Sequence, residues 1–393
     1  MTRRSPAARA RGFSLIELLV AVAVGLVLTL AVSAVLVRGE GRNRASLAVG
    51  DIDQGGAYVA SILDGVLRSA GSGFASRAPE TFGCRLNARR GGNALLPRAA
   101  AWPAPFAGFT QNPRVAPVII GKDQSAAGSD VIAVMRGNGG FGEAAMEVLA
   151  LGPPLGLRNT IGLRNNDLLL LADGNPECLL LQTTGLVAPP LNAGVDTVAL
   201  EGGTGQYHTV TGPNRNLVDF GVPTANTVVV NLGSGEAVGI TPRNPPQFML
   251  YGVGANRTLF GLDMLAVDGG EVQPLVEGVV EMRALYGVDT DNDAVLDAWV
   301  DPGVAPYDSA SLLAGTPAAQ QLLMQIVAVR VGLILQTSRA EREEVAPADI
   351  VLFADLDPAL QQVRTLTAEQ RRYRHRIVEF TVPLRNVLMA RAP

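Results

Sequence analysis

The chain has 393 residues, enough for one large domain or two ordinary ones. Apolar residues make up 48% of it and charged residues 17%, and its 44 glycines and 25 prolines predict many turns, so the composition excludes a disordered chain and favours a loop-rich fold. A net charge of −4 gives no general attraction for nucleic acid, and two cysteines exclude both a disulfide-dense scaffold and a four-cysteine zinc site.

An apolar stretch at residues 13–37 follows a basic N-terminus. Residues 1–12 contain four arginines and no acidic residue, so their removal would leave a net charge of about −8. A helix over residues 13–37 would be about 37 Å long, enough to cross a hydrocarbon core of about 30 Å. Because positive charge before a spanning segment stays on the cytoplasmic side, we expect everything after Arg38 to lie across the membrane.

The residues alone leave three interpretations of this stretch open: a permanent anchor, a signal peptide cut after the apolar core, and a leader cut before it. Residues 32–34 (VSA) offer the small residues that a signal peptide requires. Glu17, the one charge inside the stretch, costs up to about 3 kcal/mol in a membrane. It either extends towards the headgroups or serves a partner, and cleavage between Gly12 and Phe13 would create a positive α-amine with which such carboxylates could pair.

The sequence RGFSLIELLV (residues 11–20) closely resembles the leader junction of type IV prepilins and of type II secretion pseudopilins. The resemblance implies that a membrane-embedded prepilin peptidase cuts after Gly12 and methylates the new amine of Phe13. It also implies that Glu17 is retained and pairs with the N-terminal amine of a neighbouring subunit during assembly. Such a pair would relieve the cost of an unpaired carboxylate among apolar helices.

The helical pattern continues beyond Arg38. Apolar residues recur at three- and four-residue spacing and predict one buried face: Val59, Ile62, Leu63, Val66 and Leu67. The helix should stop at residues 70–73 (AGSG), where glycine suits a C-terminal cap. Residues 72–114, rich in Gly, Pro and Ala, predict an irregular excursion.

Short apolar runs separated by turn residues begin at residue 115 and predict strands. The runs lie at residues 115–120, 130–135, 146–151, 167–172, 177–182, 227–231, 248–253, 258–264, 279–288, 326–338 and 376–385. Helical patterns between them are few, which favours an antiparallel α+β arrangement over a doubly wound parallel sheet.

Four segments extend the resemblance to the PilW-type minor pilins over nearly the whole chain. Residues 185–245 and 300–322 do not share this resemblance. The segments are SDVIAVMRG (129–137), VEGVVEMRALYGVDTDNDAVLDAWV (276–300), IVAVRVGLIL (326–335) and RHRIVEFTVPLRN (374–386). The resemblance implies a pilin-like fold, in which the second half of a long N-terminal helix packs on an antiparallel sheet. It also implies an inner-membrane protein whose partners are the prepilin peptidase, other minor pilins and the major pilin.

These observations predict four regions: a cleaved leader (1–12), a transmembrane half-helix (13–37), an amphipathic half-helix (38–71) and a periplasmic β-rich head (72–393). The function expected from them is a structural subunit that helps to prime and assemble type IV pili. The alternatives are a pseudopilin of type II secretion and a membrane-anchored periplasmic binding protein.

An acidic stretch at residues 289–297 is the strongest candidate for a metal site. Oxygen ligands at alternate positions of a calcium loop would come from Asp289, Asp291, Asp293, the Val295 carbonyl and Asp297. The pattern departs from an EF-hand loop because position 294 is Ala, where Gly is preferred, and position 300 is Val, where a bidentate Glu is expected. Weak Ca²⁺ binding and a bare turn both remain open, since Asp and Asn also stabilise turns.

The remaining chemistry-bearing residues are few. Cys84 and Cys178 either form one disulfide in an oxidising compartment, worth about 4–5 kcal/mol for so long a loop, or are two unrelated core residues. The chain has two histidines, His208 and His375, and neither a GxSxG nor an HExxH pattern, so we expect no enzymatic activity. The arginine-rich run at 371–376 is typical of a strand edge protected by charge, with an acidic or phosphate partner as the alternative.

Overall fold

The fold is seen in a computed structural model, which forms two compact units, Met1–Asp51 and Ile52–Pro393. The structure describes residues 14–91, 93–140, 144–174, 176–187, 195–200, 207, 217–235, 244–266 and 271–391. The leader junction at Gly12 and Phe13 and the side chain of His208 therefore lie outside the described residues.

Helix α1 runs from Leu15 to Arg68. Its end agrees with the predicted stop, because Gly71 and Gly73 follow it with φ angles of 78° and 86°. This left-handed conformation is accessible to glycine without a steric penalty and turns the chain away from the helix axis. Short elements η1 (Ala75–Arg77) and α2 (Ala78–Thr81) come next.

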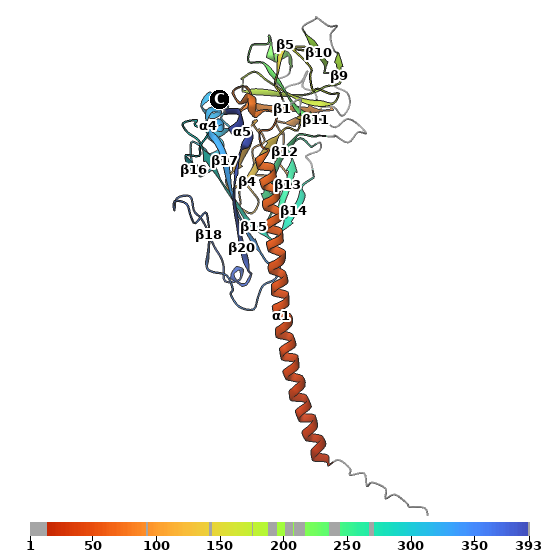
Figure 1. Cartoon of the computed structure of the whole chain (residues 1–393), viewed down its shortest axis with the longest axis vertical. Coiled ribbons are helices and arrows are strands. Elements are labelled where there is room, and N and C mark those ends of the chain that lie inside the picture. Colours follow the sequence, from red (N-terminus) through yellow and green to blue (C-terminus); the bar gives the residue numbers. More distant parts are fainter. Residues whose placement is uncertain are drawn as a thin grey trace, which may run out of the picture. The chain divides into compact units, whose positions relative to one another are not determined.

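The largest sheet has nine strands in the order β2-β1-β8-β7-β11-β5-β6-β10-β9. Figure 1 labels β1, β5, β9, β10 and β11 among them. In chain order the strands of this sheet are β1 (Arg85–Arg90), β2 (Asn93–Leu96), β5 (Met146–Ala150), β6 (Leu155–Leu157), β7 (Asp167–Ala172), β8 (Glu177–Gln182), β9 (Gly185–Val187), β10 (Asp196–Ala199) and β11 (Val228–Ser234). Among the described residues, the strand pairings within this sheet are antiparallel except that of β1 with β8, which is parallel and sets Leu86 beside Cys178.

The central strands of this sheet are buried on both faces. In β7, Leu168 and Leu170 belong to the main core, whereas Leu169 and Leu171 belong to a second core on the opposite face. This explains why the sequence there is a continuous apolar run rather than an alternating one.

A five-stranded antiparallel sheet has the order β14-β13-β12-β4-β3, and a four-stranded one has the order β16-β15-β17-β20. The first contains β3 (Val118–Gly121), β4 (Val131–Arg136), β12 (Gln247–Val253), β13 (Thr258–Asp263) and β14 (Gln273–Glu277). The second contains β15 (Val279–Val288), β16 (Ala298–Val300), β17 (Ile326–Gln336) and β20 (His375–Pro383). A small hairpin, β18 (Asp349–Leu352) with β19 (Gln362–Thr365), covers a third core. The remaining short helices are η3 (Leu217–Phe220), α3 (Ser309–Leu312), α4 (Pro317–Gln325), η5 (Gln370–Arg372) and α5 (Arg385–Arg391).

The C-terminal part of α1, from Ile52 onward, packs into the main core. Val59, Leu63 and Leu67 are fully buried there, as the periodicity predicts, and Ile62 and Val66 are partly buried beside them. A Cβ atom at Gly56 would lie 2.9 Å from Cγ2 of Val378 in β20. The absence of a side chain at position 56 therefore lets the helix backbone approach the sheet closely.

The predicted fold class is confirmed: an apolar N-terminal helix accompanies antiparallel sheets in an α+β, pilin-like arrangement. Each of the eleven predicted apolar runs coincides with a strand or most of one. The prediction of an irregular excursion at 72–114 was wrong in part, because β1 and β2 lie there. Their sequence, rich in Arg and Asn, lacks the apolar pattern of the other strands, and the pairing of β1 with distant β8 stabilises them.

Candidate functional site

The start of α1 is a capping box. Ser14 precedes the helix, and its Oγ accepts a hydrogen bond from the Ile16 N–H at 3.4 Å. The Glu17 carboxylate in turn accepts one from the Ser14 N–H at 3.3 Å. Two of the N–H groups that a helix start leaves without partners are thereby satisfied, and the negative side chain suits the positive end of the helix dipole.

The residues that follow form a helix long and apolar enough to cross a membrane, from Leu15 to Ala34. These side chains are exposed in the structure, with exposed fractions of 53% to 78% for the large apolar ones. Thr29, a polar residue inside the segment, donates its hydroxyl to the carbonyls of Gly25 and Leu26 at 3.0 and 2.9 Å. The segment therefore suits a lipid environment, in which polar groups need partners within the protein.

The loop at residues 289–297 is organised around Asp289, which is fully buried at the end of β15. Its carboxylate accepts hydrogen bonds from the N–H groups of Asn292 at 2.7 Å and Ala294 at 3.0 Å. It also forms an ion pair with Arg391 of α5, 102 residues away. A buried carboxylate needs such partners, and Arg391 neutralises Asp289, the residue that would be the first ligand of a calcium loop.

Three of the predicted ligands lie together. Carboxylate oxygens of Asp289, Asp291 and Asp297 all lie within 4.8 Å of one another. Asp293 is not part of this group, and its carboxylate instead accepts a hydrogen bond from the Val295 N–H at 2.7 Å. The arrangement fits an ion bound by three carboxylates better than a complete EF-hand loop, which needs more oxygen ligands.

The backbone of the loop makes the sharp turn that calcium loops make. Ala294, at the position where the EF-hand pattern prefers Gly, has a φ angle of 67°, and Asn292 has one of 66°. An alanine in this left-handed region is strained, and the two hydrogen bonds from this turn to Asp289 help to hold it there.

Charge in the loop is unevenly compensated. The Asp293 N–H lowers the pKa of Asp291, but burial and repulsion from Asp293, Asp297 and Asp289 together outweigh it and raise that pKa. The hydroxyl and N–H of Thr290 donate to Asp297 at 2.6 and 2.7 Å, and they lower its pKa. Asp291 therefore faces the uncompensated negative charge of the loop, which a cation would relieve.

The two cysteines meet at the parallel pair of strands. The structure joins Cys84, just before β1, to Cys178 in β8, with their Cα atoms 5.6 Å apart. Arg85 and Glu177, the adjacent residues, form an ion pair at 2.6 Å. Both contacts tie β1 to β8 across a long loop.

The arginine-rich run before β20 is largely satisfied within the chain. Arg374 pairs with Glu341, and Arg371 pairs with Glu344 at 2.7 Å. β20 stands at the end of its sheet's strand order, as the charge pattern predicts for an edge strand.

Comparison with known proteins agrees with this geometry. Residues 7–33 match the family described as the prokaryotic N-terminal methylation motif, which overlaps the apolar start of α1. With its α+β fold, the chain is thus a pilin-like protein. Residues 251–386 match the family described as Type IV Pilus-assembly protein W, so this part of the chain is similar to PilW-type proteins, and the two matches together support a type IV pilus-associated, pilin-like protein.

The matches are narrower than the predicted resemblance, because residues 34–250, including the segment 129–137, lie outside both. Neither matched family is a family of enzymes. No curated protein and no solved structure matches the chain.

Sequence reasoning missed two features of the site. The pattern Ser14-x-x-Glu17 before an apolar run is the signature of a capping box and was readable in advance. The role of Arg391 was not readable, because no local pattern connects it to Asp289.

Proposed function

We propose that the protein is a minor pilin, a non-enzymatic subunit that takes part in priming and assembling type IV pili. The observation that supports this most is the presence, in one chain, of the N-terminal methylation motif at 7–33 and the PilW match at 251–386. The first is the motif of a processed membrane helix, and the second spans the whole four-stranded sheet and the β18–β19 hairpin, together with β13 and β14.

In this proposal a prepilin peptidase cuts between Gly12 and Phe13 and methylates the amine of Phe13. Residues 13–37 hold the subunit in the inner membrane, residues 38–71 continue as the amphipathic half-helix, and the head (72–393) lies in the periplasm. Glu17 then pairs with the N-terminal amine of a neighbouring subunit, either another minor pilin or the major pilin. An unpaired carboxylate inside a bundle of apolar helices is costly, so this pair would set the axial register of assembly.

Co-purification tests the proposed role. Full-length protein expressed with a prepilin peptidase should be recovered with other minor pilins and the major pilin after crosslinking. Recovery with pseudopilins of a type II secretion system instead would favour that alternative. Recovery as a monomer with an uncut N-terminus would favour a membrane-anchored binding protein.

We further propose that the loop at 289–297 binds Ca²⁺ weakly, in the range of about 0.1–1 mM that extracellular calcium modules show. The support is the cluster of Asp289, Asp291 and Asp297 and the uncompensated charge on Asp291. The Arg391 ion pair lowers the expected affinity, because the cation must share Asp289 with a guanidinium.

Calorimetry with CaCl₂ on the detergent-solubilised full-length chain tests this binding. Asp291→Asn should abolish the heat, whereas Asp357→Asn, an equal charge change at an exposed loop position, should leave it unchanged. No heat at millimolar calcium would leave the loop as a turn held by its own hydrogen bonds.

The disulfide is the third proposal about this chain. The head would fold in the oxidising periplasm, where Cys84 and Cys178 can form the bond. The bond should be detected as one cysteine-linked peptide pair in the mass spectrum of the non-reduced, digested protein.

A further inference from the structure

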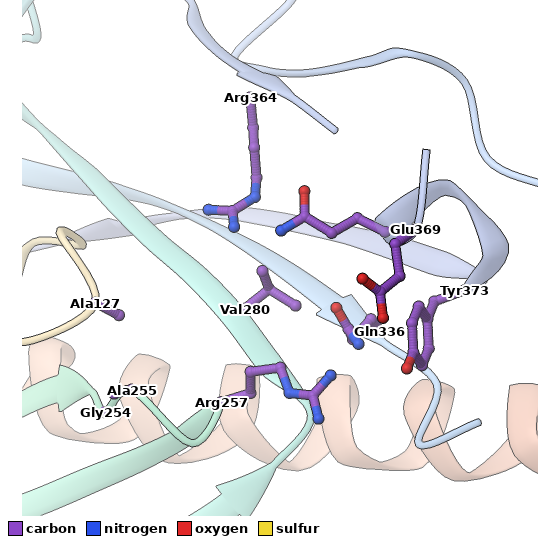
Figure 2. Close-up of a pocket in the computed structure, with 10 residues that line it drawn as sticks. Ala127, Gly254, Ala255, Arg257, Val280, Gln336, Arg364, Glu369 and Tyr373 are labelled. Carbon is purple, nitrogen blue, oxygen red and sulfur yellow. The ribbon is translucent and has the colours of Figure 1, made fainter. Parts of the chain in front are cut away.

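A polar cleft of about 420 Å³ lies outside the features already described. Its walls come from the turn between β12 and β13, the end of β17, β19, and the segment around η5. Figure 2 shows Arg364 and Arg257 entering from opposite sides, with Gln336 between them and Glu369 and Tyr373 beside it. The volume falls within the range of clefts that bind small ligands or a few side chains.

Two donors in these walls have no partner among the described residues. Gln336 is 4% exposed, and its Nε2 atom is buried with no hydrogen-bond partner. The Nε atom of Arg364 is also buried with no hydrogen-bond partner, although the Nη1 atom of the same side chain pairs with Glu281 at 2.7 Å. A buried donor without a partner costs about 1–3 kcal/mol, so an acceptor that reaches these two atoms would be stabilising.

His375, the neighbour of Gln336 on the next strand, also has buried nitrogen atoms without partners in the described part of the chain. His375 lies opposite Gln336 in the ladder of β17 and β20, and both of its ring nitrogens are buried with no partner among the described residues. Burial lowers the pKa of His375, which favours the neutral form of its ring.

One guanidinium group of the cleft, that of Arg257, is free to bind an anion. Arg257 is exposed, its guanidinium carbon lies 5.9 Å from the centre of the Tyr373 ring, and no acidic residue among the described ones forms an ion pair with it. Arg257 has a φ angle of 61° in the tight turn between β12 and β13, and this turn fixes the position of its Cα atom. Glu281 already neutralises Arg364, and Glu369 carries a negative charge in the same wall, so the cleft has no net positive charge. Arg257 and the two orphaned donors supply enough hydrogen-bond donors for one carboxylate.

The shape of the surface indicates an extended ligand. A second, more open cleft of about 740 Å³ is lined by Arg342, Glu343, Glu344 and Arg372, and it shares Glu369 with the first. The two clefts therefore meet at Glu369 and together exceed what one small acid fills. An extended peptide can place one side chain in the first cleft and continue along the second.

We propose that this double cleft binds an extended segment of a partner protein, with one carboxylate side chain held by Arg257, Gln336 and Arg364. The cleft lies wholly within residues 127–373, so the inference does not depend on leader processing or membrane insertion.

The test uses the full-length chain in detergent micelles and the peptide acetyl-Gly-Gly-Glu-Gly-Gly-amide, followed through the side-chain amide NMR signal of Gln336. The signal should shift saturably, and Arg257→Asn should weaken binding about tenfold. Asn suits the left-handed backbone at position 257, so this variant should fold normally, and an unchanged melting temperature would verify it. Arg339→Asn, the same charge change at an exposed position outside the two clefts, should bind like the wild type.

Three outcomes would overturn the proposal. No saturable shift up to about 10 mM peptide would leave the cleft without this ligand. Equal binding of the peptide in which Gln replaces Glu would exclude recognition of the carboxylate. Equal or tighter binding of free glutarate would show that a small acid, and not a peptide segment, occupies the cleft.

Discussion

The carboxylate of Glu17 accepts a hydrogen bond from the backbone N–H of Ser14 at 3.3 Å, so the acidic residue of the apolar segment caps its own helix. The capping bond gives Glu17 a function within one subunit. The proposed pairing with a neighbour's amine gives it a second function between subunits. These two functions make different demands on the side chain, because a neutral amide can cap but cannot form an ion pair.

Glu17→Gln separates them. The variant keeps a capping side chain, so leader cleavage and the level of protein in the membrane should remain normal. Incorporation into the filament should fall about tenfold or more, because the charge pair is lost. Immunoblotting of sheared pilus fractions against whole-cell levels measures the ratio, with Ser14→Ala as the variant that weakens only the cap. Normal incorporation of Glu17→Gln together with reduced incorporation of Ser14→Ala would reduce Glu17 to a capping residue.

Gly56 should tolerate no side chain, since its Cβ would lie 2.9 Å from Val378. We expect Gly56→Ala to lower the free energy of unfolding by about 1–3 kcal/mol through overpacking. Gly65→Ala is the matched control, because nothing lies within 4 Å of its Cβ and the better helix propensity of alanine should raise stability by up to about 1 kcal/mol. Denaturant unfolding of the detergent-solubilised chain measures both, and equal effects would contradict the close contact of α1 with β20.

Removing Arg391 should expose the cost of the buried Asp289 carboxylate. Arg391→Met leaves that charge without its ion pair and should lower the free energy of unfolding by about 3–5 kcal/mol. Calcium should then restore more stability to the variant than to the wild type, because the cation no longer competes with the guanidinium. Thermal melts with and without CaCl₂ test both statements, and a calcium response equal to that of the wild type would count against a shared site.

Asp263 should make stability fall as the pH rises. Burial raises its pKa to about 6, and the hydrogen bond from the Leu265 N–H offsets this only in part. Since the carboxyl group of an unfolded chain has a pKa of about 3.9, the folded state holds the extra proton between these values. The contribution is therefore fully present below about pH 4 and is lost as the pH rises through about 6.

Asp263→Asn should remove this dependence. The amide can still accept the Leu265 bond, and it should raise the free energy of unfolding at pH 8 by about 1–3 kcal/mol without a similar gain at pH 4. Denaturant unfolding at the two pH values measures the difference. An equal effect at both would mean that the carboxyl group titrates normally.

The disulfide should be a large contributor to stability. Cys84 and Cys178 are 94 residues apart, and closing such a loop corresponds to about 4–5 kcal/mol in the chain-entropy model. The double variant Cys84→Ala/Cys178→Ala should lose stability of this order, and reductant should destabilise the wild type but not the double variant. A wild type unaffected by reductant would indicate that the bond does not form.

The sequence predicted those parts of the fold that depend on local pattern. β7 and β8 were found as uninterrupted apolar runs, since each is buried on both faces, and the end of α1 was marked by Gly71 and Gly73. β1 was missed because its stability comes from a parallel partner some 90 residues later, a pairing that no local period shows.

The candidate sites follow the same division. The acidic loop was visible because its ligands are adjacent in sequence, whereas its ion pair with Arg391 spans 102 residues. The double cleft was invisible for the same reason: Arg257, Gln336 and Arg364 come from three separate segments, and the orphaned donors of Gln336 and Arg364 result from burial. Contacts between distant segments are fixed by packing, which sequence spacing alone does not specify.

The central claim is that the chain is processed and assembled as a minor pilin, and the N-terminus of the mature protein tests it most directly. Mass spectrometry of the protein purified from cells that contain a prepilin peptidase should find a chain that begins with N-methylated Phe13. A mature chain beginning after Ala34, or one that retains residues 1–12 in the presence of the peptidase, would contradict the account.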